Sequence, residues 1–271
     1  MTTSAAFFDL DRTLMSGSSA YYVGKAAYRE GLRPWHRLLS DATSTLIFRA
    51  FGASDEKSGA VRDAILESVA GKDAADLHRM APGVIEEILP LIRPEAQALL
   101  DMHEAAGRDV YIVSASPVEI VGELARSLGI EGGLGTVSEI ADGVYSGRLD
   151  GPFLYGEGKA IKIRELAEQR GYDLQACYAY SDSGSDLPMM QLVGNPVAVN
   201  PDRALQAVAH RRGWPVVEFN VTSRRRRRTA LSGGLGVIAG AAGYMAGRLA
   251  TERQVRRLLD ETTTHRWRRR G

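Results

Sequence analysis

Short continuous apolar runs alternate along the chain with segments whose apolar residues recur at helical spacing. Four runs have the length of a strand, are rich in Val, Ile and aromatic residues, and stop at small or polar residues, which predicts buried β-strands. These runs are residues 5–8, 110–113, 177–180 and 197–199. Helical spacing, often beginning at or near a proline, covers residues 94–106, 117–128, 159–170, 187–192 and 201–211. Such alternation predicts an α/β fold, a Rossmann-like parallel sheet with helices on both faces.

Two insertions interrupt this alternation. About a hundred residues separate the first two strands, and apolar residues at helical spacing recur through much of residues 21–91, which predicts a helical cap. Later, apolar stretches at residues 136–140 and 144–149 flank Asp142-Gly143, a pair typical of a tight hairpin turn. We therefore expect a helical cap at residues 16–91, inserted into a core formed by residues 1–15 and 92–220.

Charge divides the chain near residue 220. The formal net charge of +1 combines two unlike parts. Residues 1–220 carry 21 Lys and Arg against 30 Asp and Glu, whereas residues 221–271 carry 13 Arg against three acidic residues. An acidic body of net charge −9 and a basic tail of net charge +10 therefore need separate interpretation.

Composition limits the class of protein to which the body belongs. A chain that is 44% hydrophobic and 25% charged is neither disordered nor collagen-like. The single Cys177 lies in the apolar run ACYAY, which favours a buried structural thiol over redox chemistry. No basic flank precedes the short apolar run that ends at Asp9, so we expect no signal peptide and a cytoplasmic body.

Polar side chains follow three of the predicted strands. In an open α/β sheet, ligands bind beyond the carboxyl ends of the strands. Each of these groups alone is more typical of a helix cap, a turn or a solvated side chain. Together they lie at one edge of one sheet and predict a common site. They are Asp9, Asp11 and Thr13 after the first strand, Ser114 after the second, Lys159 at a helix start, and Asp182 with Asp186 after the third.

In this order the motifs resemble the haloacid dehalogenase-like hydrolase superfamily, and within it the helical-cap subfamily that includes phosphoserine phosphatases. The resemblance covers residues 5 to about 218 and depends on FFDLDRTL, VSAS, GKAIKIREL, YSDSGSDLPMM and NPVAVNPD. It implies a phosphatase that hydrolyses phosphomonoesters of small metabolites. It further implies dependence on Mg²⁺ and passage through an aspartyl-phosphate.

The resemblance gives the four acidic residues separate roles. Asp9 would be the nucleophile and a metal ligand, and Asp182 a second ligand, with Asp186 as a ligand or the partner of one. Asp11 would give its backbone carbonyl to the metal and act as general acid and then general base. An acid at Asp11 favours phosphate esters over haloacids, because a halide leaves unprotonated while an alkoxide benefits from a proton.

The remaining site residues concern substrate binding. Ser114 and Lys159 would bind the phosphoryl group, and Thr13 would orient the loop or the phosphate unless it is only a helix N-cap. Phosphoserine phosphatases typically have a Glu nine residues after the nucleophile to bind the substrate ammonium, but this chain has Ser18 there. Arg62 would bind a substrate carboxylate, although a solvated Arg is the alternative. Phosphoserine therefore stays one candidate substrate, and a non-catalytic module that binds a phosphorylated ligand stays a second kind of function.

The basic tail has its own pattern. Arg224 to Arg228 precede an uncharged stretch, residues 229–247, which is just long enough to span a bilayer. Small residues at G-x-x-x-G spacing favour helix packing in lipid. We therefore expect membrane association, by insertion of a helix at residues 229–249 or by attraction of the arginines to anionic lipid, with a solvated tail as the alternative. Membrane association would favour a lipid or lipid-precursor phosphate as substrate. The arginine run has no interleaved aromatic residues, and no nucleic acid partner is expected.

Overall fold

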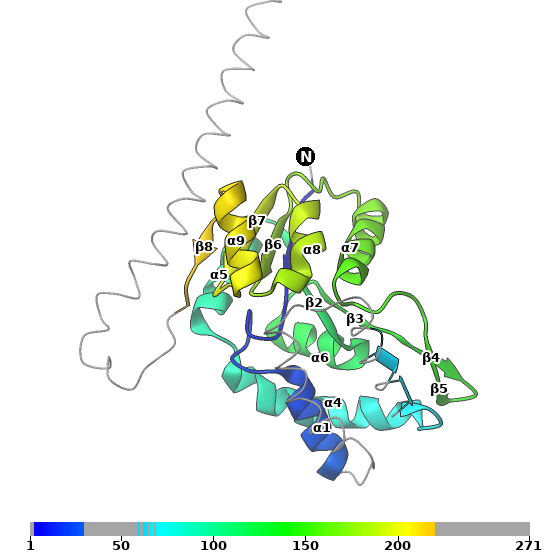
Figure 1. Ribbon diagram of the computed structural model, residues 1–271. Coiled ribbons are helices and arrows are strands. Elements are labelled where there is room, and N and C mark those ends of the chain that lie inside the picture. Colours follow the sequence, from blue (N-terminus) through cyan, green and yellow to red (C-terminus); the bar gives the residue numbers. More distant parts are fainter. Residues whose placement is uncertain (1–2, 30–58, 60–61, 64–65, 68, 220–271) are drawn as a thin grey trace, which may run out of the picture. The chain divides into compact units, whose positions relative to one another are not determined.

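The computed structural model describes residues 3–29, 59, 62–63, 66–67 and 69–219 (Figure 1). The chain divides into two units, Met1–Val216 and Val217–Gly271. Much of the predicted cap and the basic tail, residues 221–271 with the predicted membrane helix at residues 229–249, lie outside the described residues. Among the residues that are described, no helix is long and apolar enough to cross a membrane.

The predicted parallel sheet is confirmed. Its order is β3-β2-β1-β6-β7-β8. The central strand β1 (Ala5–Phe8) runs parallel to both β2 (Asp109–Pro117) and β6 (Tyr178–Ser181), with Phe8 opposite Ile112 on one side and Tyr180 on the other. Farther out lie β3 (Gly132–Thr136) beside β2, β7 (Asn195–Val199) beside β6, and the edge strand β8 (Val216–Val217).

Helices cover both faces of this sheet, as predicted. Phe7 of β1 belongs to a buried cluster with Ile163 of α7 and Met189 of α8. Phe8, one residue later, points to the other face, where its ring packs against His103 of α5. The helices of the core are α5 (Pro94–Ala105), α6 (Val118–Leu128), α7 (Glu157–Arg170), α8 (Leu187–Leu192) and α9 (Arg203–Arg212).

Strand β3 was not predicted, because its sequence GGLGT lacks the apolar run of a buried strand. Its glycines are explained by packing. A Cβ on Gly133 would lie 2.6 Å from the carbonyl carbon of Val121, and one on Gly135 would lie 2.6 Å from the backbone nitrogen of Val118. Helix α6 therefore lies directly against the backbone of β3, and this contact requires glycine.

The described residues of the predicted cap include two helices and a short 3-10 turn. They are α1 (Ser19–Arg29), α4 (Ala74–Ile88) and η1 (Leu89–Leu91). Glu87 of α4 accepts hydrogen bonds from Lys25 (2.6 Å) and Arg29 (2.5 Å) of α1. The chain enters and leaves this region side by side, since the Ser16 N–H donates to the Leu91 carbonyl. The cap boundaries at residues 16–91 stay a prediction.

The predicted hairpin is confirmed and contacts the start of α4. Its strands β4 (Ser138–Ala141) and β5 (Val144–Leu149) are antiparallel. Asp142 and Gly143 both have positive φ, as a tight turn of this type requires. The backbone of Tyr145 exchanges hydrogen bonds with Gly71 and Lys72, so the hairpin ties the core to the cap region (Figure 1).

Candidate active site

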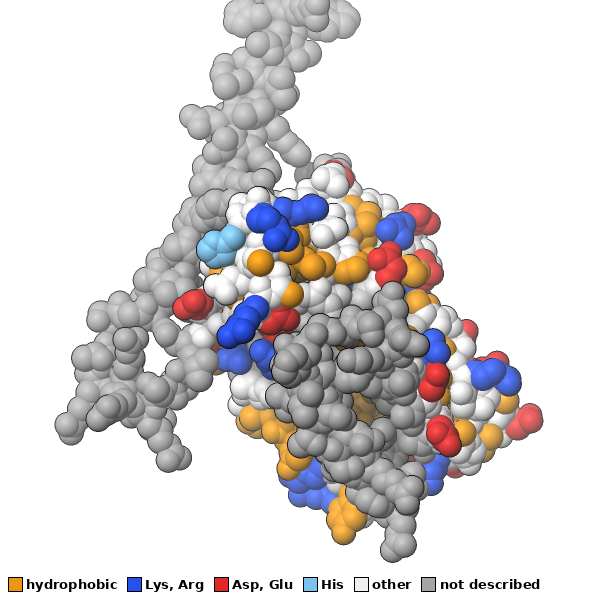
Figure 2. Space-filling model, viewed as in Figure 1, with side chains coloured by type: hydrophobic (Ala, Val, Ile, Leu, Met, Phe, Trp, Pro, Cys, Tyr) orange, Lys and Arg blue, Asp and Glu red, His pale blue; other side chains and the backbone are white. Residues whose placement is uncertain are grey.

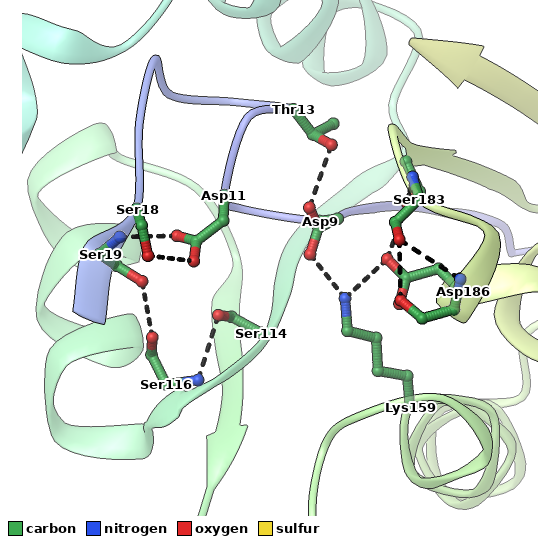
Figure 3. Close-up of polar contacts among 12 residues, drawn as sticks. Asp9, Asp11, Thr13, Ser18, Ser19, Ser114, Ser116, Lys159, Ser183 and Asp186 are labelled. Atoms are coloured by element: carbon green, nitrogen blue, oxygen red, sulfur yellow. Dashed lines mark hydrogen bonds and ion pairs between the residues drawn. The ribbon is translucent and has the colours of Figure 1, made fainter. Parts of the chain in front are cut away.

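The loop after β1 presents Asp9 at the carboxyl edge of the sheet. The Asp9 N–H donates to the Tyr180 carbonyl of β6 (2.9 Å), and the side chain is buried. The chain then makes a turn in which the Met15 N–H donates to the Leu10 carbonyl (3.1 Å). This turn brings the Thr13 hydroxyl to Asp9 Oδ2 at 3.0 Å, so Thr13 orients Asp9 itself (Figure 3).

Lys159, in the first turn of α7, lies between two carboxylates. Its Nζ is 2.6 Å from Asp9 Oδ1 and 2.9 Å from Asp186 Oδ2 (Figure 3). The Lys159 side chain is only 3% exposed, and both carboxylates are also buried. The Ser181 hydroxyl donates to the same Asp186 oxygen (2.7 Å) and helps fix it. Groups that are far apart in sequence thus form one buried charged cluster.

Burial and charge alter the protonation of this cluster. Burial, together with the negative charges of Asp186, Asp182 and Asp11, raises the pKa of Asp9 to about 7 against the opposing charge of Lys159. Burial opposes the charged form of Lys159 as well, but the carboxylates of Asp186 and Asp9 outweigh it and raise the Lys159 pKa. The ammonium is therefore charged, and negative charge at Asp9 is costly unless cations neutralise it.

Asp182 follows β6 and is fully buried. Arg12 Nε lies 3.1 Å from Asp182 Oδ2, although the Arg12 side chain is 46% exposed. The Asp182 carbonyl accepts a hydrogen bond from the backbone N–H of Asp202 (2.7 Å), and the Asp202 carboxylate in turn accepts from Gly184 N–H (2.9 Å). Asp202, the N-cap of α9, therefore supports the loop that carries Asp182 and Asp186.

Asp11 points away from Lys159, toward the first residues of α1 (Figure 3). The Ser18 hydroxyl donates to Asp11 Oδ2 (3.1 Å), and the Ser19 N–H donates to Asp11 Oδ1 (2.8 Å). Asp9 and Asp11 thus have different partners, a Lys for the first and hydroxyl and amide donors for the second. Two carboxylates with different surroundings can serve different chemical roles.

Ser114 lies within β2 and is buried. Its Oγ accepts a hydrogen bond from Ser116 N–H (3.2 Å), which leaves the Ser114 O–H proton to donate elsewhere. The Ser116 hydroxyl is 2.7 Å from the Ser19 hydroxyl of α1. A continuous set of polar contacts therefore joins Ser114, the start of α1 and Asp11.

Arg62 is not among these contacts. Its guanidinium pairs with the adjacent Asp63, at 2.8 Å from Nε and 2.7 Å from the second nitrogen, and both side chains are well exposed. Within the part of the chain that the structure describes, no hydrogen bond or ion pair joins Arg62 to another predicted site residue. Its role in binding a carboxylate stays a prediction.

The chemistry of the acidic side chains fits a divalent cation. Mg²⁺ takes hard oxygen ligands, is held by one or two carboxylates, and completes its shell with water and phosphate oxygens. Asp9 and Asp182 offer carboxylate oxygens of this kind, and Asp186 and the Asp11 carbonyl offer further oxygens. No group of three or more His, Cys, Asp or Glu side chains is arranged as a metal site in the part of the chain that the structure describes. In that part Lys159 and Arg12 lie against the carboxylates.

Sequence reasoning missed several residues that shape the site. Arg12, Ser19, Ser116 and Ser181 contact predicted site residues, and Asp202 supports their loop. Ser18 was noted only as a departure from a family pattern. The one available signal was position, since all but Asp202 lie within two residues of a predicted residue or of Ser18. Serines in turns are too common for position alone to assign a partner.

The chain is similar in sequence and in fold to several known proteins. The family model described as haloacid dehalogenase-like hydrolase matches residues 6–191. A phosphoserine phosphatase of Mycobacterium tuberculosis (strain ATCC 25618 / H37Rv) is 38% identical over 94% of this chain and 82% of its own length. A histidinol-phosphatase of Neisseria meningitidis serogroup C (strain 8013) is 32% identical over 79% of this chain and 98% of its own. A Bordetella pertussis Tohama I crystal structure of unknown function has a TM-score of 0.67 at 26% identity, covering 80% of this chain and 98% of that one.

Proposed function

Because this chain belongs to the haloacid dehalogenase-like hydrolase family, we propose that it is a Mg²⁺-dependent phosphatase that transfers the phosphoryl group of a monoester to Asp9 and then to water. The observation that carries this proposal is the buried Lys159 ammonium between Asp9 and Asp186. A site with several anionic oxygens and a fixed cation suits a phosphate, whose charge must be neutralised before a carboxylate can attack it.

Asp9 would be the nucleophile. Thr13 and Lys159 each hold one of its two oxygens, so the carboxylate has a fixed orientation. Mg²⁺, held by Asp9, Asp182 and the Asp11 carbonyl with Asp186 beside them, would supply the charge that reduces repulsion between the carboxylate and the phosphate dianion. Lys159 would also attract the phosphoryl oxygens, and Ser114 has a hydroxyl proton left to donate to one of them.

Asp11 would move the protons. Attack by Asp9 expels an alkoxide, which leaves more easily if Asp11 protonates it. The Asp11 carboxylate formed in this way can then take a proton from the water that hydrolyses the phosphoryl group on Asp9. The first step needs an acid and the second a base near the phosphate, so one carboxyl group that is not itself held by Lys159 can serve both, and Asp11, with its separate partners, meets this condition.

The test is hydrolysis by the purified full chain. We expect release of phosphate from monoesters with Mg²⁺, little release when the metal is chelated, and loss of activity in Asp9→Asn. A matched control is Asp142→Asn, which makes the same change at an exposed hairpin turn and should leave activity intact. Binding of phosphorylated ligands without hydrolysis would instead favour the non-catalytic module.

The substrate class that we propose is broader than the single substrates for which the relatives are named. One relative is named for phosphoserine and another for histidinol phosphate, so the shared chemistry is a small phosphorylated metabolite. Ser18 offers no negative charge to a substrate ammonium, and its hydroxyl is already used by Asp11. A screen of phosphoserine, histidinol phosphate and lysophospholipid phosphates, with and without Mg²⁺, would rank these candidates.

Residues 16–91 are proposed as the cap that covers the site.

Residues 221–271 are proposed as a segment that associates with membranes. On the face of the molecule seen in Figure 2, basic and acidic side chains of the described residues are interspersed. The excess of arginine in residues 221–271 is the feature that would attract anionic lipid. Washing membranes with high salt and then alkali tests this: release by salt indicates surface attraction, resistance to both indicates insertion, and absence from membranes refutes the proposal.

A further inference from the structure

Both side-chain oxygens of Asp11 accept hydrogen bonds at the start of α1, from Ser18 just before the helix and from Ser19, its first residue. The Ser18 hydroxyl and the Ser19 N–H each take a different oxygen of the carboxylate, at 3.1 and 2.8 Å (Figure 3). A carboxylate with both oxygens engaged has a defined plane and direction. The orientation of Asp11 therefore depends on where α1 begins.

Ser19 also connects Asp11 to Ser114. Ser19 is fully buried, and its hydroxyl lies 2.7 Å from that of Ser116, whose N–H donates to Ser114 Oγ at 3.2 Å. The backbone N–H of Ser19 thus binds Asp11, and its side chain contacts Ser116, which binds Ser114. The start of α1 therefore contacts Asp11 directly and Ser114 through Ser116.

We infer that Ser18 is a positioning residue for Asp11, and that the start of α1 fixes the position of Asp11 relative to Ser114. This inference rests on the proposed function and extends it to a position where the chain departs from phosphoserine phosphatases. Where those enzymes have a Glu that binds the substrate ammonium, the Ser18 hydroxyl of this chain donates to the Asp11 carboxylate of the protein itself. Shifting α1 would change the direction of Asp11 and the position of Ser114 together.

The chemistry of the leaving group makes this testable. An alkoxide needs a proton from Asp11, whereas a nitrophenolate departs as a stable anion and needs none. The ratio of kcat/KM for an alkyl phosphate to that for p-nitrophenyl phosphate therefore measures how well Asp11 is positioned. General structural damage would lower both values and leave the ratio unchanged. Asp11→Asn defines the ratio expected when the acid is lost.

We expect Ser18→Ala to lower this ratio about tenfold, because the carboxylate loses one of its two hydrogen-bond donors. Ser18→Thr keeps the hydroxyl and should restore the ratio. Ser16→Ala is the matched control, since Ser16 is an exposed serine two residues earlier whose hydroxyl donates to the Leu91 carbonyl. Ser19→Ala keeps its N–H, so it should lower both kcat/KM values and preserve their ratio.

The outcomes separate this inference from the proposed function. If the wild-type chain hydrolyses neither substrate, both fail. If Asp11→Asn lowers the ratio but Ser18→Ala does not, or if Ser18→Ala lowers both kcat/KM values equally, Ser18 does not position the acid and only the inference is overturned. A fall of the ratio in Ser19→Ala as large as that in Ser18→Ala would likewise refute the assignment of separate contacts to the two residues.

Discussion

Replacing Lys159 with Met is the sharpest perturbation of the charged cluster. Met has nearly the same length and fills a similar volume, but it removes the only side-chain cation within hydrogen-bond distance of Asp9 among the described residues. Asp9 and Asp186 would then be two buried carboxylates with no ammonium between them. The change tests whether Lys159 stabilises this arrangement of charges.

The size of the effect follows from burial. Lys159 is 3% exposed, and its two partners are 7% and 3% exposed, so water screens the pairs very little. Removing one partner of a buried ion pair costs about 3–5 kcal/mol, because the other charge is left uncompensated. The cost should depend on pH. Without Lys159, a buried carboxyl such as Asp9 or Asp186 binds its proton more tightly in the folded protein than in the unfolded chain. Its protonation therefore stabilises the folded protein at low pH, and this stabilisation is lost as the pH rises through the pKa of the folded state.

The assay is urea unfolding followed by circular dichroism in chelated buffer, for the wild type, Lys159→Met and Lys162→Met. Lys162 is three residues along the same helix and pairs with Glu165 at 3.1 Å, but its side chain is 36% exposed. Surface pairs of that kind contribute about 0–1 kcal/mol. We expect Lys159→Met to lose about 3–5 kcal/mol near pH 8 and clearly less near pH 5. Equal stability of the two variants at both pH values would refute the argument.

Three further predictions concern the fold and the metal. Gly133→Ala should lose about 1–3 kcal/mol in urea unfolding, because its Cβ would overlap the Val121 backbone, whereas Gly122→Ala, with open space around it, should be neutral or stabilising; equal effects would contradict the packing argument. Burial lowers the pKa of His103 to about 3, below its value of about 6.5 in the unfolded chain, so stability should fall as the pH drops below that value. From pH 7 to pH 5 this contributes about 2 kcal/mol, and His103→Gln should remove that dependence. Mg²⁺ should raise the melting temperature of the wild type more than that of Asp182→Asn, and an equal rise would exclude Asp182 as a ligand.

Much of the core was predictable because its strands are buried on both faces. Strand β1 has the predicted bounds, residues 5–8, because its uninterrupted apolar run stops at the charged Asp9 and so marks where the buried strand ends. Strand β2 continues past the predicted end at residue 113 to Pro117, because parallel pairing with β3 extends it through polar residues. Strand β3 itself was missed because contact with α6 selects glycine there in place of apolar residues.

The site was predictable to the extent that topology brings strand ends together. Asp9, Lys159 and Asp186 converge because parallel strands β1 and β6 are neighbours and α7 begins at the same edge. The partners of Asp11 could not be predicted in this way. Ser18 and Ser19 reach it because of the angle at which α1 leaves the loop, and no periodicity in the sequence encodes that angle.

The most direct test of the account is whether phosphate becomes bound to Asp9. In Asp11→Asn the first step should survive with p-nitrophenyl phosphate, which needs no acid, while the second step should slow because its general base is missing. Rapid mixing with Mg²⁺ should then give a burst of one nitrophenolate per protein, and mass spectrometry of the acid-quenched protein should find one phosphoryl group on Asp9. Nitrophenolate release without a burst and without a phosphoryl group on Asp9, or a phosphoryl group on another residue, would contradict the proposed mechanism.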